Sequence, residues 1–419
     1  MSTEPGPATG HRGAQSGILR QPMAVWATAG AAVVAFMGIG LVDPILPSIA
    51  KGLDATPSQV SLLFTSYFLI TAVAMLVTGF VSSRIGGRKT LLAGLALVVV
   101  FAALAGTSDT VGQLVGFRAG WGLGNALFVS TSLAVIVGAA SGGSESAILL
   151  YESALGLGMA CGPLLGALLG NASWRYPFFG TATLMAVGFV AIAALLKEQP
   201  KPARRTGLSE PIKALAHGGL ATTAASAFFY NYAFFTVLAF SPFVLDMSPY
   251  RSGGVFFAWG VLLAVFSVLV APRLQQRFGS VRVLGTSLVL MAADLMLLGY
   301  GSHGAAVAAT IASGAFIGMN NTVYTELALE ISDAPRPVAS AGYNFVRWFA
   351  AAAAPFLAPK LEERFDVHAP FTVAAVAAVA AMLIAVVRRA HLRRDAVHEE
   401  RVVGAHDPLA VELAAGQPR

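Results

Sequence analysis

Several charged side chains lie inside long apolar stretches of the sequence, where a charge is expensive to hold. The clearest cases are the carboxylates Asp43, Glu152 and Glu326 and the guanidinium of Arg118. A charged residue at the centre of a membrane span costs about 2.5–3.5 kcal/mol on insertion scales, so it normally faces a partner or water. Burial favours the neutral form of a carboxyl group, and a nearby guanidinium favours its charged form. The three carboxylates are therefore candidates for reversible proton binding, and Arg118 is the candidate counter-charge, so all four are candidates for proton coupling.

The depth of these charges predicts which of them meet. Asp43 lies about 7–8 Å from the outer end of its apolar stretch, at 1.5 Å per residue, and Arg118 lies at a similar depth, so their depths are compatible with a pair. The alternatives are a helix-end residue beside Pro44, and an arginine that reaches the surface with its head group. Glu326 and Arg347 are both expected in the inner half. There they are expected to neutralise each other in a structural ion pair, which is favoured over a functional role.

The composition defines the class of protein that holds these charges. Of 419 residues, 56% are apolar and 11% are charged, against roughly 25% charged in an average soluble domain. So few charges cannot cover the surface of a water-soluble protein of this size. Apolar stretches of roughly 20 residues, the length that crosses a bilayer as a helix, lie at about 24–49, 59–82, 90–107, 111–139, 145–170, 177–196, 219–246, 252–271, 283–301, 304–332, 338–359 and 368–388. The sequence therefore predicts an all-α membrane protein with twelve transmembrane helices.

A polar interruption at 197–217, with five basic residues and three prolines, divides the chain. We expect a cytoplasmic N-tail at 1–22, a six-helix bundle at 23–196, a cytoplasmic linker at 197–217, a second six-helix bundle at 218–390 and a cytoplasmic C-tail at 391–419. With the N-terminus inside, 20 of the 27 Lys and Arg fall in inner segments and 5 in outer loops. Because Lys and Arg are enriched on the cytoplasmic side, both termini are predicted to be cytoplasmic.

Short patterns recur between the two predicted bundles. The segment 79–86, after the second stretch, resembles 272–279, which follows the eighth stretch 193 positions later. Pro163-Leu164-Leu165 recurs as Pro355-Phe356-Leu357 at an offset of 192. Two parallel repeats of six spans predict a pseudo-twofold transporter with its site between the halves.

Four local patterns combine glycine with charged or bulky residues. A tight cytoplasmic turn is expected at Gly79, Arg84, Gly86, Arg88 and Lys89. The fourth span contains Arg118, Trp121, Gly122 and Gly124, and an outer turn contains Trp174 and Arg175. The fifth span contains Gly158, Gly162, Pro163 and Gly166. Small residues at this spacing let another helix approach closely, and the proline bends the span.

These patterns resemble motifs of the major facilitator superfamily, and in particular of its twelve-span drug:proton antiporters, over about residues 24–390. The resemblance implies two pseudo-symmetric six-helix bundles that give alternating access to a central site. It also implies that the basic residues of the turn bridge the halves, and that the small residues of the fifth span seal the halves on the outer side. The sequence departs from the family pattern at Ser83, where the family has Asp, and at Trp121, where it has Gln.

Polar and aromatic residues on the spans that would line the central site are candidates for contact with a substrate. They are Tyr67, Trp121, Asn125, Tyr230, Asn231, Phe234, Asn321, Tyr343 and Arg347. An apolar, aromatic cavity with few polar anchors suits lipophilic or cationic drug-like compounds.

The resulting hypothesis is proton-coupled efflux of lipophilic or drug-like compounds across a bacterial inner membrane. The expected partners are the small-molecule substrate, protons and membrane lipids, with no nucleic acid, and the chain is expected to be a monomer. No catalytic motif, phosphate-binding loop or metal-ligand spacing stands out, so no enzyme activity, cofactor or metal is expected. The single cysteine, Cys161, excludes an intrachain disulfide. Two alternatives stay open: a proton-coupled importer of a small polar solute, and a lipid-handling or receptor protein of the same fold.

Overall fold

The computed structural model describes residues 21–140, 144–198, 205–332 and 334–392, without the side chains of 144–149, Glu152, Glu330 and Arg336. In this part of the chain every regular element is helical. The first half runs through α2 (Met23–Gly40), the short turn η1 (Asp43–Ile45), α3 (Leu46–Gly52), α4 (Pro57–Ile85), α5 (Gly87–Gly106), α6 (Val111–Ala139), α7 (Ser144–Gly170) and α8 (Tyr176–Leu195). A short helix, α9 (Glu210–Ala214), follows in the linker.

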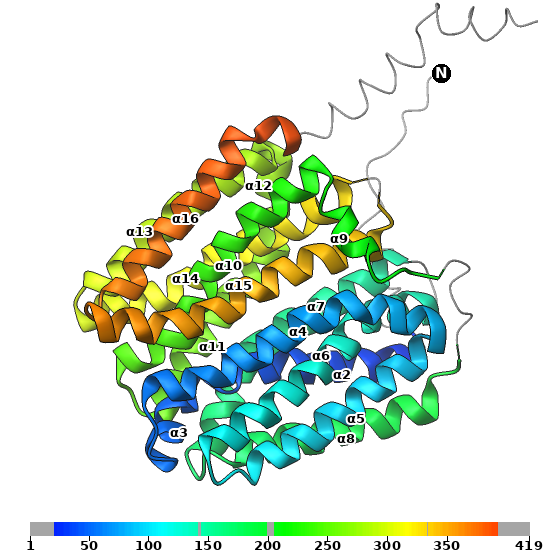
Figure 1. Ribbon diagram of the computed structural model, residues 1–419, viewed down its shortest axis with the longest axis horizontal. Coiled ribbons are helices and arrows are strands. Elements are labelled where there is room, and N and C mark those ends of the chain that lie inside the picture. The colour runs from blue at the N-terminus through cyan, green and yellow to red at the C-terminus, as the bar shows by residue number, and fades with distance from the viewer. Residues whose placement is uncertain (1–20, 141–143, 199–204, 333, 393–419) are drawn as a thin grey trace, which may run out of the picture.

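The second half repeats this order of helices. It consists of α10 (Gly218–Leu245), α11 (Pro249–Val265), a π-helical turn η2 (Phe266–Val270), α12 (Ala271–Phe278), α13 (Ser280–Tyr300), α14 (His303–Glu330), α15 (Arg336–Arg364), α16 (Ala369–Val387) and the turn η3 (Arg389–Leu392). Figure 1 shows the helices of the second half, from the green of α10 to the orange-red of α16, gathered above those of the first half, which run from blue through cyan to the green of α8 at the bottom.

Ten helical segments of the described chain are long and apolar enough to cross a membrane, which makes this a multi-pass membrane protein. Large apolar side chains such as Val187, Val190 and Val376 are exposed on the outside of the bundle, as lipid-facing positions require. Helices α14 and α15, with 28 and 29 residues, are not among the ten. They carry more polar side chains, including Asn321 and Arg347. The count of twelve spans stays a prediction.

The two halves meet along two pairs of helices, α4 with α15 and α7 with α11. In the second pair, small residues bring the backbones together. A Cβ added at Gly260 of α11 would lie 2.5 Å from the Cα of Ala160, and one at Gly253 would collide with Ala167. Toward the inner end, a Cβ at Gly156 of α7 would lie 3.3 Å from the Cβ of Ala264. Contact between the halves therefore runs along much of both helices.

The glycines of the fifth span pack elsewhere than the sequence predicted. A Cβ at Gly158 or at Gly162 would lie 2.5 Å from the carbonyl oxygen of Val33 or Met37, and one at Gly166 would collide with the oxygen of Leu41. All three carbonyls belong to α2 or the residue after it, within the same half. The expectation that these glycines seal the two halves was wrong. Neighbouring alanines on another face of α7 make that contact.

The inner turns of the two halves share one backbone feature. Gly86 and Gly279 have φ of +95° and +80°, a conformation that glycine adopts without steric cost. Beside the first turn, the Ser83 hydroxyl accepts a hydrogen bond from the backbone N–H of Thr206 (3.3 Å), and Arg84 donates to the carbonyl of Thr206 (3.2 Å). The linker is thus held to α4 although Ser83 replaces the acid of the family pattern. Its helix α9 also packs against α15.

The resemblance implied that the basic residues of this turn bridge the halves, but Arg88 and Lys89 do not. Arg88 donates to the carbonyl of Ala193 at 2.7 Å, and Lys89 lies 3.7 Å from a carboxylate oxygen of Glu198. Both partners belong to α8 or the segment after it. On the outer side Arg175 holds the turn between α5 and α6 through the carbonyls of Gly106 and Ser108 and the carboxylate of Asp109.

The contact of α7 with α2 predicts the effect of enlarging Gly162. Gly162→Leu forces a side chain against the backbone of Met37, and overpacking of this kind typically costs about 1–3 kcal/mol. We expect a clear fall in the thermal unfolding midpoint of the purified protein in detergent, together with reduced yield. Gly30→Leu on α2 is the matched control, because Gly30 is exposed with no atom within 4 Å of an added Cβ. Equal midpoints for the two variants would contradict the packing described.

Candidate functional site

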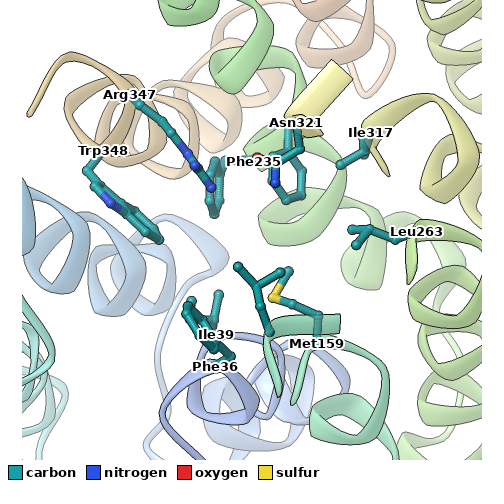
Figure 2. A pocket seen from close by; sticks show the side chains of 11 residues that line it. Phe36, Ile39, Met159, Phe235, Leu263, Ile317, Asn321, Arg347 and Trp348 are labelled. Carbon is teal, nitrogen blue, oxygen red and sulfur yellow. The ribbon is translucent and has the colours of Figure 1, made fainter. Parts of the chain in front are cut away.

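A small cavity lies where the two halves meet, and Figure 2 shows the side chains around it. It is enclosed by helices of both halves: α2 and α7 from the first, and α10, α11, α14 and α15 from the second. The lining residues are Phe36, Ile39, Leu155, Met159, Phe234, Phe235, Leu263, Ile317, Asn321, Arg347 and Trp348. Nine of these are apolar or aromatic, so the cavity offers mainly a hydrophobic surface.

An aromatic stack closes one side of the cavity and crosses the boundary between the halves. The Phe68 ring of α4 lies 4.6 Å from the Phe235 ring of α10 and 5.4 Å from the Trp348 ring of α15, measured between centroids. Phe235 and Trp348 are 5.9 Å apart, and Phe234 is 4.4 Å from Phe235. Aromatic pairs at such distances contribute about 0.5–1.5 kcal/mol beyond their burial. The stack therefore helps to hold the halves together in this conformation.

The polar part of the cavity consists of Asn321 and Arg347. Both side chains are half-buried, and both point into the space beside Phe235 (Figure 2). The Asn321 carbonyl oxygen and the Arg347 Nε have no hydrogen-bond partner. The Arg347 guanidinium lies 5.3 Å from the centre of the Trp348 ring.

A second cluster of unusual side chains is buried in the first half, around Asp43 and Arg118. Both residues are fully buried, and among the described side chains and backbone neither Asp43 carboxylate oxygen nor any Arg118 nitrogen has a hydrogen-bond partner. The guanidinium lies over the rings of Tyr67 and Trp121, 4.3 and 4.6 Å from their centroids. The two charges act on each other electrostatically, yet they form no direct ion pair. Asp43 and Arg118 are thus close enough to interact electrostatically, but they do not form the expected salt bridge.

The position of Asp43 follows from a break in the first span. Helix α2 ends at Gly40, and Pro44, which has no N–H to donate, lies in the turn η1. This turn packs against α7 of its own half and against α10 and α11 of the other. Asp43 is therefore a buried acid at the junction of the halves.

The other predicted charge pair is not formed. Glu326 is exposed, and its carboxylate accepts a hydrogen bond from Gln275 at 2.6 Å, whereas Arg347 lies in the cavity. The expected ion pair between Glu326 and Arg347 was wrong, because the two side chains leave α14 and α15 toward different surroundings. The side chain of Glu152, the third candidate for proton binding, lies outside the described part of the chain.

The structure sorts the predicted substrate contacts into three groups. Phe234, Asn321 and Arg347 line the cavity. Tyr67 and Trp121 surround Arg118 instead, because the fourth span turns this face inward against α4. The remaining four are buried beside the cavity or away from it: Asn125, Tyr230 (which donates to the carbonyl of Ile317), Asn231 (which donates to the carbonyl of Ala227) and Tyr343.

Sequence reasoning missed most of the apolar lining. Phe36 and Ile39 on α2, and Leu155 and Met159 on α7, belong to spans that are apolar on every face. Periodicity does not distinguish a lipid-facing residue from a cavity-facing one on such helices. Phe234 is the one aromatic residue of the lining that the sequence analysis had named.

Comparisons with known proteins agree on one family. Residues 28–277 match the family described as the Major Facilitator Superfamily. The chain is 49% identical over 380 residues to multidrug efflux protein YfmO of Bacillus subtilis (strain 168), covering 90% of this chain and 96% of that protein. It is 31% identical over 197 residues to the tetracenomycin C resistance and export protein of Streptomyces glaucescens, covering 44% and 36%. The crystal structure of a D-xylose-proton symporter has the same fold, with a TM-score of 0.70, 17% identity and coverage of 86% and 96%.

A double-mutant cycle tests whether Asp43 and Arg118 are coupled without a direct bond. Asp43→Asn and Arg118→Gln each leave the other charge buried without its counter-charge. We expect both to lower the unfolding midpoint, and the double variant to lose less than the sum. The coupling should be on the order of 1 kcal/mol, within the range of neighbouring residues. Additive effects would contradict the coupling.

The control for this cycle is the pair that the structure separates. Glu326→Gln and Arg347→Gln should add without coupling, because the two side chains share no partner.

Proposed function

Because the chain belongs to the Major Facilitator Superfamily, it is a membrane transporter and not an enzyme, and we propose that it exports lipophilic, drug-like compounds in exchange for protons. The observation that carries this proposal is the apolar and aromatic cavity enclosed by helices of both halves. Its support from relatives is the 49% identity, over nearly the whole chain, to a protein named for multidrug efflux.

Alternating access is the mechanism that this arrangement favours. The halves meet through α4 with α15 and α7 with α11, and the cavity lies between these pairs. Opening the cavity to one side separates Phe68 from Phe235 and Trp348, which is the contact that the aromatic stack makes between the halves. Glycine and alanine meet at several points between α7 and α11, and such close contacts of small residues are suited to a rocking motion.

The proposed location is the inner membrane of a bacterium, with both termini in the cytoplasm. The support is the distribution of Lys and Arg, of which 20 fall on one side and 5 on the other. Ser83, Arg84 and the linker lie on the side that carries the larger number.

Proton coupling is proposed to reside at Asp43. A buried carboxylate responds to the distance of its counter-charge, because the guanidinium favours the charged form and burial the neutral one. Asp43 lies at the junction of the halves, whereas Arg118 belongs to the first half alone. Movement of the halves changes what surrounds Asp43, and so provides a way for the transport cycle to bind and release a proton. Glu152 is the competing position.

Filling the cavity should stop transport. Leu263→Trp places an indole into this small cavity, and we expect uptake of chloramphenicol, a neutral lipophilic compound, into proteoliposomes with an acidic interior to fall at least fivefold. Val261→Trp is the matched control on the same helix, because Val261 is 39% exposed on the outside of the bundle. No uptake by wild type of any compound in a lipophilic panel would contradict efflux. Uptake that is equal for the two variants would place the substrate elsewhere.

The proton site is tested by substrate-induced proton release in weakly buffered detergent solution. Asp43→Asn cannot release a proton from this position, so it should bind chloramphenicol without acidifying the solution, while Glu152→Gln should acidify it like wild type. The opposite pattern would move the coupling site to α7.

A further inference from the structure

Among the described residues that line the cavity, Arg347 contributes the one charged side chain. Its guanidinium points into the space from α15, beside Asn321 of α14 and the ring of Phe235 (Figure 2). Its Nε has no hydrogen-bond partner, although this atom is buried. The cavity therefore presents a cationic donor group to whatever occupies it.

The groups around this guanidinium are neutral. The Trp348 ring lies beside it at 5.3 Å, and the hydroxyls of Tyr230 and Tyr343 are close enough to interact with its charge. In the part of the chain that the structure describes, the two ion pairs join other residues, Lys89 with Glu198 and Arg175 with Asp109. No described carboxylate neutralises Arg347.

One other source of negative charge has to be weighed. Glu152 belongs to α7, three residues before Leu155 and seven before Met159, and positions at this spacing share a helix face. Its side chain lies outside the described part of the chain. If the carboxylate of Glu152 neutralises Arg347, the cavity should show no preference for anionic ligands. If the carboxylate comes from the substrate, anionic ligands should be preferred, so experiment can separate the two cases.

A cation within a membrane span costs about 2.5–3.5 kcal/mol, and such residues face a partner or mark a functional path. Arginine presents its donors in a planar fork that binds a carboxylate through two parallel hydrogen bonds. Asn321 can donate a third hydrogen bond from its amide, and Phe235 and Trp348 offer flat apolar surfaces for an aromatic body. A cationic compound would meet repulsion at the same place.

We propose that the preferred substrates are lipophilic organic anions, in particular aromatic carboxylates, whose charged group binds Arg347 and Asn321 while the ring lies against Phe235 and Trp348. This rests on the efflux function proposed above and names its substrate class. It also replaces the expectation of cationic substrates that the aromatic residues alone had favoured.

The test compares three probes of one shape: 1-naphthaleneacetate, 1-naphthaleneacetamide and 2-(1-naphthyl)ethylamine. Titration calorimetry with the purified full chain in detergent should give an affinity for the carboxylate at least tenfold above that for the neutral amide, with the amine weakest. Arg347→Gln should reduce the preference for carboxylate over amide to within twofold while the affinity for the amide stays the same. Arg347→Lys should keep a preference of severalfold. Arg273→Gln is the matched control, because Arg273 lies on α12 outside the cavity and donates to the carbonyl of Leu269.

Three results would overturn the proposal. The first is a wild-type preference for the amine or the amide. The second is a tenfold carboxylate preference that persists in Arg347→Gln. The third is a carboxylate preference that is absent in wild type and appears in Glu152→Gln, which would mean that Glu152 neutralises Arg347. If Arg347→Gln does not fold, the wild-type ranking of the probes still decides.

Transport separates this proposal from the broader one. Proteoliposomes that accumulate the amide but do not prefer the carboxylate would leave efflux standing and remove the anion preference. Failure to transport any of the three probes or the lipophilic panel would contradict the efflux function itself.

Discussion

Helix α7 is fixed by main-chain contacts on two sides, and the other parts of the site take their positions from it. On one side its glycines meet the carbonyl oxygens of Val33 and Met37 on α2, and on the other Ala160 packs directly on Gly260 of α11. The first contact joins two helices of the same half through the backbone, so α2 and α7 must move together. The second joins the two halves, and glycine and alanine meet at several points along it. Relative motion is therefore expected between α7 and α11, with α2 carried along.

This arrangement connects the two charged parts of the protein. Helix α2 supplies Phe36 and Ile39 to the cavity and is followed directly by the turn that holds Asp43. A substrate that displaces α2 and α7 relative to the second half thus changes the surroundings of Asp43, which packs against α10 and α11. Any such coupling is reciprocal, because a proton that favours one arrangement of the halves must favour substrate binding or release to the same extent. Arg347, on α15, stays with the second half.

Prediction from the sequence succeeded where a strong local rule applied. The helical class follows from apolar stretches of membrane-spanning length, and the repeat is visible in Pro163 and Pro355, 192 positions apart. The prediction that Gly158 and Gly162 seal the two halves was wrong. A pattern of small residues shows that another helix packs closely, but it does not identify that helix. Glu326 and Arg347 were placed together from depth alone, although the direction of each side chain around its helix decides whether they meet. The apolar lining was invisible, because in a membrane protein the lipid-facing and cavity-facing sides of a helix have similar compositions.

The π-helical turn η2 lies in an interval where the second half has one residue more than the first. Gly122 packs on the carbonyl of Tyr67, and Gly314 packs on that of Trp259, so these contacts correspond at an offset of 192. The positive-φ glycines of the inner turns, Gly86 and Gly279, correspond at 193. The additional residue lies between Trp259 and Gly279, the interval that contains η2. A π turn closes its hydrogen bonds from i to i+5 and so accommodates one inserted residue without ending the helix. The second half thus holds one residue more than the first between these two landmarks, so the two halves differ in shape at this end of the molecule and their symmetry is not exact.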